Sequence, residues 1–143
     1  MQQINEGDKA PPFLELTANK GSTRVVYFYP KDFTPGCTTE ACEFRDLHEK
    51  ITEQNAIVLG VSPDSPESHE KFIAKHGLPY LLVADEDHAI ASAYGVWKER
   101  SMYGKKFTGI ERSTFVVGPD GTIKKIFRKV KPAGHAEQVL AAI

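Results

Sequence analysis

The stretch PKDFTPGCTTEACEFRDLHEKI, residues Pro30–Ile51, decides the fold because it joins a strand to a long helix through a short turn. The run before it, RVVYFY at Arg24–Tyr29, is β-branched and aromatic, which is typical of a buried strand. The sequence predicts where the helix starts, since Thr34 can cap it and Pro35 fits the first helical position. Cys37 then falls at about the third helical position, beyond the carboxyl end of a strand, where open α/β sheets usually place their sites.

Cys37 is placed where a thiol should become a nucleophile. The unpaired N–H groups of a first helical turn and the helix macrodipole both favour a thiolate over a thiol. The alternative is that Cys37 and Cys42 are buried packing residues, which is in general the commoner fate of a free cysteine. We favour the nucleophile, because the capped start of a helix is a poor place to hide a thiol.

The second cysteine, Cys42, lies five residues further along the same helix. In a continuous helix that step rotates by roughly 140° and rises about 7.5 Å, which puts the two Cα atoms roughly 8–9 Å apart. A disulfide requires less than about 7 Å between Cα atoms. A Cys37–Cys42 bond therefore requires the first turn or two to unwind, and we predict a redox pair that bonds only after a conformational change.

The rest of the predicted helix, which ends near Gln54, serves as scaffold. One face carries a stripe at helical spacing, and polar residues cover the other side. The stripe consists of Cys37, Ala41, Phe44, His48 and Ile51. We interpret His48 as a histidine at the edge of the core rather than a base for Cys37, because eleven residues of helix separate them by roughly 16 Å.

Length and composition indicate one globular domain spanning residues 1–143. Hydrophobic residues make up 41% and charged residues 26% of the chain, and the net charge is −1. This balance favours neither a nucleic-acid nor a membrane partner. The amino-terminal MQQINEGDKAPPF has no apolar signal core, so we expect a cytoplasmic protein, where a catalytic disulfide is normal and a structural one unusual. We also expect a monomer.

The remaining pattern predicts an α/β sandwich around a mixed β-sheet flanked by helices. Residues 1–12 should form an irregular arm, and Phe13–Leu16 a short edge strand. Further strands are expected at Ile57–Val61, Leu81–Ala84, Ser113–Val117 and Thr122–Arg128, the last two joined by the turn Gly118-Pro119-Asp120-Gly121. Further helices are expected at Pro66–His76, capped by Ser65 and ended by Gly77, at His88–Tyr94, closed by Gly95, and within Pro132–Ile143.

Residues 96–111, VWKERSMYGKKFTGIE, are predicted to form a long connection. Basic and aromatic side chains alternate loosely along this segment. It can be a solvated loop, or it can be a docking surface for a partner or a flap near the site.

The spacing Pro30-x-x-x-Thr34-x-x-Cys37 resembles the active-site signature of the peroxiredoxins. The longer string YFYPKDFTPGCTTEACEFRD resembles the subgroup with both cysteines on one helix, the bacterioferritin comigratory protein or peroxiredoxin Q type, and the likeness continues through GIERSTFVVGPDG. This resemblance covers nearly the whole chain. It implies a thioredoxin-like fold and the reduction of hydrogen peroxide and organic hydroperoxides. The segment Phe13–Thr23 is shorter than in the family, which leaves open whether the family's amino-terminal hairpin is present.

The resemblance also implies roles for individual residues. Cys37 resembles the peroxidatic cysteine and Cys42 the resolving one, with thioredoxin or a similar dithiol as the reductant. Thr34 resembles the hydroxyl that orients thiolate and peroxide, and Pro30 the residue that shields the sulfur.

Arg112, in the segment ERSTF, matches the arginine that stabilises the thiolate and polarises the peroxide, and Glu40 matches the acid that positions that arginine. A guanidinium suits this task because its planar fork can donate to sulfur and oxygen together. By itself Arg112 could equally form a surface ion pair with Glu111 or a neighbour.

Two other classes of function compete with the enzyme hypothesis. A metal module has little support, because two cysteines supply half of a structural zinc site and the five histidines show no compact ligand spacing. Phosphate-binding glycine motifs are also absent from the sequence, so we expect no cofactor. A peroxide sensor or redox-switched holdase using the same thiol pair stays open beside the enzyme.

Overall fold

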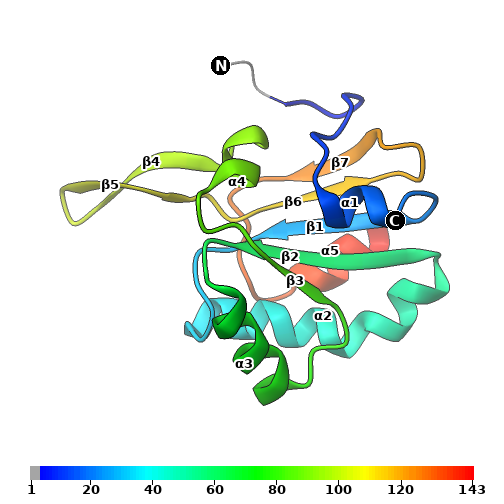
Figure 1. Ribbon diagram of the computed structural model, residues 1–143, viewed down its shortest axis with the longest axis horizontal. Coiled ribbons are helices and arrows are strands. Elements are labelled where there is room, and N and C mark those ends of the chain that lie inside the picture. Colours follow the sequence, from blue (N-terminus) through cyan, green and yellow to red (C-terminus); the bar gives the residue numbers. More distant parts are fainter. Residues whose placement is uncertain (1–3) are drawn as a thin grey trace.

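The computed structural model describes residues 4–143, apart from the side chain of Met102. A five-stranded mixed sheet in the order β3-β2-β1-β6-β7 forms its centre (Figure 1). β1 runs parallel to β2, and β2 to β3, whereas β6 lies antiparallel to both β1 and β7. The strands are β1 (Thr23–Phe28), β2 (Ala56–Ser62), β3 (Leu81–Ala84), β6 (Ser113–Val117) and β7 (Ile123–Phe127).

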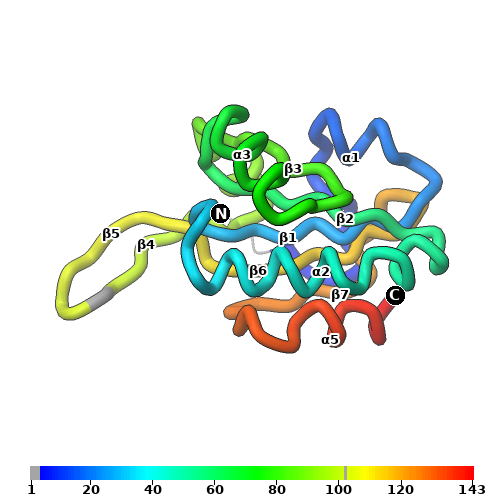
Figure 2. The backbone as a smooth tube through the Cα atoms, turned by 90° about the horizontal axis from the view of Figure 1, so that it is seen from below, coloured from blue at the N-terminus to red at the C-terminus, as the bar shows by residue number. Residues whose placement is uncertain are grey.

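Helices cover both faces of this sheet. Figure 2 shows α2 lying along one face with α5 beside it, and α3 belongs to the same layer, while α1 and α4 lie on the opposite face. Successive residues of β1 alternate between the two layers, as the period of a strand requires: Val25 and Tyr27 pack toward α2, and Val26 and Phe28 away from it. The helices are α1 (Leu14–Ala18), α2 (Pro35–Glu53), α3 (Pro66–His76), α4 (Ala89–Ala93) and α5 (His135–Ala142).

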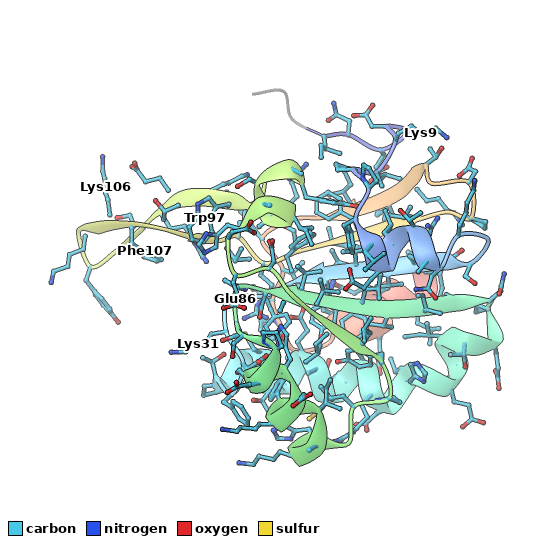
Figure 3. The ribbon with its side chains drawn as sticks, in the orientation of Figure 1. Lys9, Lys31, Glu86, Trp97, Lys106 and Phe107 are labelled. Carbon is cyan, nitrogen blue, oxygen red and sulfur yellow. The ribbon has the colours of Figure 1, made fainter. Side chains whose placement is uncertain are left out.

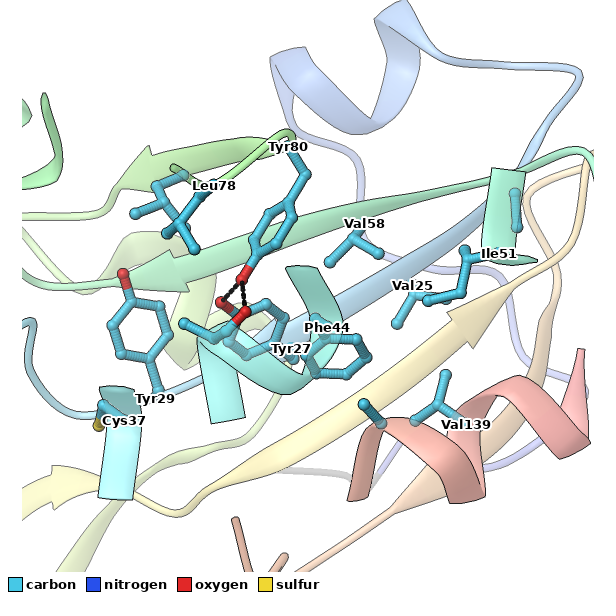
Figure 4. Close-up of a cluster of buried hydrophobic side chains, with 14 of the residues drawn as sticks. Val25, Tyr27, Tyr29, Cys37, Phe44, Ile51, Val58, Leu78, Tyr80 and Val139 are labelled. Carbon is cyan, nitrogen blue, oxygen red and sulfur yellow. Dashed lines mark hydrogen bonds between the residues drawn. The ribbon is translucent and has the colours of Figure 1, made fainter. Parts of the chain in front are cut away.

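Aromatic packing fixes the middle of α2 against the sheet. The ring of Phe44 stacks on Tyr27 with centroids 4.8 Å apart, and both side chains are fully buried. The hydroxyl of Tyr80 donates to the carbonyl of Ala41, at 2.9 Å, and shares a 2.8 Å hydrogen bond with the hydroxyl of Tyr27 (Figure 4). The middle of α2 is therefore held by apolar burial and by a hydrogen-bonded tyrosine pair.

The prediction of a long connecting loop at residues 96–111 is wrong. β4 (Trp97–Met102) and β5 (Lys105–Ile110) pair antiparallel into a separate two-stranded sheet. Figures 1 and 3 show this hairpin projecting away from the main sheet. Tyr103 and Gly104 both adopt positive φ, 53° and 78°, as a two-residue hairpin turn with the twist of the strands requires.

The edge strand predicted at Phe13–Leu16 is also wrong, because α1 occupies this place. The buried Arg24 explains the helix: its Nη1 donates to the carbonyl of Leu16 at 2.7 Å, and so satisfies an oxygen near the helix end. The shortened segment Phe13–Thr23 thus holds a helix, and no strand lies between Phe13 and Ser22.

The other predicted elements are confirmed, with bounds shifted by a few residues at most. Ser65 caps α3 by accepting from the N–H of Ser68, and Gly77 ends it in the left-handed conformation. Of the irregular arm predicted for residues 1–12, residues 1–3 lie outside the described part, and residues 4–12 form turns with one bridge from Lys9 to Thr122. Within the described residues, none of the helices has the length and apolar character needed to cross a bilayer.

Candidate functional site

The loop after β1 leads directly into the start of α2. Thr34 occupies the N-cap position with extended backbone, and Pro35 is the first helical residue, as predicted. The expected side-chain cap is absent, however: the Thr34 hydroxyl donates to the carbonyl of Lys31, at 2.9 Å, instead of accepting from the helix. The hydroxyl is therefore used to close the preceding turn.

Cys37 is buried, with 1% of its surface exposed, so the expectation that its thiol would not be hidden is wrong. The cause lies in the apolar stripe of the helix, because Cys37 shares its inward face with Ala41 and Phe44. Figure 4 places Cys37 at one end of the buried cluster, near Tyr29. The sulfur still has a polar partner: Nη2 of Arg112 lies 3.2 Å from its Sγ.

Strand pairing brings Arg112 to the start of α2. Ser113, the first residue of β6, pairs with Phe28, the last residue of β1, so Arg112 lies beside the loop that follows β1. Its Nη1 donates to Oε1 of Glu40 at 2.6 Å while Nη2 donates to Cys37. The alternative of a surface ion pair with Glu111 is wrong, because Glu111 pairs with Lys98 at 3.2 Å.

Burial has a large effect on the carboxyl group of Glu40, which is fully buried. Desolvation raises its pKa to about 7, and the charge of Arg112 counteracts only part of this rise. Its Oε2 has no hydrogen-bond partner among the described residues. Burial lowers the pKa of Arg112, but the negative charges of Glu40 and Cys37 outweigh burial and raise it, so the guanidinium stays cationic.

A cavity of about 520 Å³ opens beside Pro30 and Arg112. A small molecule in this cavity would meet the guanidinium of Arg112. The hairpin β4–β5 contributes to the wall, which agrees with the interpretation of residues 96–111 as a flap near the site, although movement of the hairpin stays a prediction. The other lining residues are Glu99, Arg100, Ser101, Glu111, Lys129 and Val130.

Cys42 lies on the same unbroken helix as Cys37, and both thiols are free. Cys42 is partly exposed, whereas Cys37 is buried. The helical geometry expected from the sequence, with Cα atoms roughly 8–9 Å apart, therefore applies to this state. His48 is partly buried and stacks on Tyr80, which confirms a position at the edge of the core.

A polar cluster near the site was not predicted from the sequence. Asp32, in the loop before α2, contacts His69 of α3 at 2.8 Å. The two residues are 37 positions apart, and neither belongs to a motif of fixed spacing. A signal was nevertheless present, since an aspartate so close to a nucleophile, and a histidine on the inner face of a predicted helix, both need polar partners.

Comparison with known proteins agrees with this geometry. The sequence pattern of the AhpC/TSA family matches residues 7–126. The chain is 48% identical to Peroxiredoxin Bcp of Bacillus subtilis over 149 residues, covering 98% of this chain and 95% of that protein.

Solved structures give the same result. A structure of Xylella fastidiosa PrxQ superimposes with a TM-score of 0.91 at 42% identity, covering 99% of this chain and 96% of that one. Xanthomonas campestris Peroxiredoxin Q superimposes with a TM-score of 0.85 at 52% identity, covering 89% and 81%. The fold is therefore the thioredoxin-like fold of the peroxiredoxins. The chain belongs to the AhpC/TSA family and, within it, to the Bcp or peroxiredoxin Q subfamily of thiol peroxidases.

Proposed function

We propose that Cys37 is the peroxidatic cysteine and that Arg112 activates it. The supporting observation is the double contact of one guanidinium, with Nη2 on the sulfur and Nη1 on Glu40. Nη2 places a positively charged donor 3.2 Å from the attacking sulfur. Glu40 fixes the plane of the guanidinium, so that the fork can also donate to a peroxide oxygen.

In the first step the thiolate of Cys37 attacks the distal oxygen of the hydroperoxide and the O–O bond breaks. The sulfur is oxidised to a sulfenic acid, and the other peroxide oxygen leaves as water or an alcohol after it takes up the proton that Cys37 lost on becoming a thiolate. Pro30 lines the cavity next to Arg112, and we assign to it the shielding of the sulfur that the family resemblance implies. Thr34, at the helix start, orients thiolate and peroxide.

In the second step the thiol of Cys42 displaces the hydroxyl group of the sulfenic acid as water and forms the Cys37–Cys42 disulfide. Because an unbroken helix holds the two residues too far apart, the first turn of α2 unwinds first. A dithiol such as thioredoxin then reduces the disulfide by thiol–disulfide exchange. Such dithiols are kept reduced in a compartment like the cytoplasm.

The proposed substrates are hydrogen peroxide and organic hydroperoxides. The proposed active form is a monomer, in which residues 1–143 act as one domain. The cavity beside Arg112 leaves room for an organic group on the peroxide. Alkyl peroxide reduction is the activity named for the Xanthomonas campestris bacterioferritin comigratory protein, whose structure superimposes with a TM-score of 0.85.

The test uses two cysteine variants and thioredoxin-coupled peroxide turnover. Cys37→Ser is expected to abolish turnover, whereas Cys42→Ser should consume one equivalent of peroxide and then stop. Mass measurement after one equivalent should show that the wild type loses two hydrogens, located between the peptides of Cys37 and Cys42. Full turnover in Cys37→Ser would refute the assignment, and a single stoichiometric oxidation of the wild type would favour a sensor.

A further inference from the structure

A buried polar network lies at the base of the loop that precedes α2. Its centre is Asp32, whose side chain is 1% exposed. Oδ1 accepts from the hydroxyl of Tyr29 at 2.6 Å, and Oδ2 accepts from the hydroxyl of Ser68 at 2.8 Å. The Nδ1 atom of His69 lies 2.8 Å from the same Oδ2. One carboxylate thus joins the end of β1 to α3.

His69 and Asp64 complete the network. The Nε2 atom of His69 faces the carbonyl of Val83 at 3.1 Å, so both ring nitrogens lie against oxygen atoms of the protein. Oδ2 of Asp64 accepts from the backbone N–H of Asp32 at 2.8 Å and from the hydroxyl of Ser62 at 2.7 Å. Both the side chain and the backbone of Asp32 are therefore held.

These groups do not form a metal site of the kind their composition suggests. One ligand atom each from Asp32, Asp64 and His69 lies within 4.8 Å of the others. Those atoms are, however, already hydrogen-bonded within the protein, since Asp64 accepts from the N–H of Asp32 and the two ring nitrogens of His69 contact Asp32 and the carbonyl of Val83. The network is better explained as a fixed point for the loop.

A second fixed point lies within α2. The hydroxyl of Tyr80 holds the carbonyl of Ala41, immediately before Cys42 (Figure 4). Between Asp32 and Ala41 lies the segment that carries Cys37. It begins with Phe33, whose φ of 65° is strained for a bulky side chain. Strain at that residue is relieved when the segment unwinds.

We propose that Asp32 and His69 are positioning residues that anchor the loop and set how readily Cys37 leaves its peroxide-reactive position for Cys42. This inference rests on the proposed resolution of Cys37 by Cys42. The anchor holds Asp32 in the position from which the chain continues into the folded first turn, so its release favours unwinding, whereas the Tyr80 hydroxyl keeps the residues from Ala41 onward in place. Neither Asp32 nor His69 touches the reacting sulfur.

The anchor affects the two chemical steps in opposite directions. Peroxide attack needs the assembled helix start, because Arg112 meets the sulfur only there. Disulfide formation needs the unwound segment. A weaker anchor shifts the population toward the unwound state, which slows oxidation of Cys37 and speeds its resolution.

The experiment compares Asp32→Asn, His69→Gln and the double variant by rapid-quench mass spectrometry after mixing with hydrogen peroxide. Each single variant should form the disulfide from the sulfenic acid up to roughly tenfold faster, as expected for loss of a charge-assisted hydrogen bond, while Cys37 is oxidised more slowly by a smaller factor. The double variant should have a smaller effect than the two single effects combined, because both substitutions remove the Asp32–His69 contact. Ser68→Ala removes a single bond to Asp32 and should shift both rates in the same directions by a smaller factor.

The matched control is Asp85→Asn. Asp85 is also buried, but its carboxylate accepts from the backbone of Ile90 and Ala91 in α4, at 3.0 and 2.8 Å, and not from the loop. It should lose stability and keep the wild-type ratio of the two rates. The inference is overturned if the Asp32 and His69 variants keep that ratio or slow both steps together. A wild type that forms no Cys37–Cys42 disulfide would instead overturn the proposed function.

Discussion

The first turn of α2 and the body of the same helix are held by different forces. The body, from Ala41 to Ile51, buries Phe44 and Ile51 completely and accepts a hydrogen bond from Tyr80. The first turn has no side-chain cap and follows a residue with strained φ, and its buried Cys37 and Glu40 depend in addition on polar contacts from Arg112.

Because of this difference, we expect the body of α2 to determine the stability of the fold and the first turn to determine the reactivity of Cys37. Apolar burial is lost only when the core opens, whereas polar contacts exchange more easily with water. We therefore expect the first turn to unwind and rewind while the body stays folded, and Cys42 lies just inside the part that is expected to stay. The predictions below test that separation, beginning with the largest effect.

Phe44→Ala should destabilise the protein by about 3–5 kcal/mol, because it leaves a cavity under a fully buried ring that stacks on Tyr27. Denaturant unfolding of the reduced protein measures the loss. Below the unfolding transition, the rate of Cys37 oxidation should stay within about threefold of the wild type. An oxidation rate that falls in step with stability would show that the two regions are not separable.

Arg112→Met should lower the rate of Cys37 oxidation by about 10²- to 10³-fold, since it removes the donor aimed at the reacting atoms. Stopped-flow mixing with peroxide gives this rate. Arg112→Lys keeps the positive charge and loses the fork, so its rate should lie between those of Arg112→Met and the wild type. If lysine restored the full rate, the planar double contact with Cys37 and Glu40 would have no role.

Glu40 should make stability fall as pH rises. Its pKa is about 7 in the folded protein against 4.5 for an ordinary glutamate, so the folded state binds more protons between these values. Stability from this group is present below about pH 4.5 and is lost by about pH 7, by at most about 3 kcal/mol. In Glu40→Gln that decline should be missing from unfolding curves measured across this range.

The comparison variant is Glu49→Gln, the same substitution at an exposed carboxyl of the same helix. It should keep the wild-type slope between pH 4.5 and 7. Equal slopes in Glu40→Gln and the wild type would mean that the buried carboxyl stays ionised, and that Arg112 compensates fully for its desolvation.

Local patterns accounted for most of the fold. β3 and β6 have the bounds predicted from their apolar runs, and the start of α2 follows from Thr34 and Pro35. The hairpin β4–β5 escaped prediction because β5 is exposed along most of its length, so it lacks the alternation that identifies a half-buried strand. The five-residue helix α1 is too short to show a helical period.

In the candidate site, too, some features follow from local sequence and others only from the tertiary structure. The sequence alone placed the candidate nucleophile, Cys37, in the first helical turn, because a cap position, a proline and a cysteine fall within four residues. Only the tertiary structure decided that the sulfur is buried, that Arg112, 75 residues away, reaches it, and that Asp32 is anchored by His69. The physical reason is range: propensity and capping act over a few residues, whereas these contacts depend on the pairing of β1 with β6 and on the packing of α3 beside the loop.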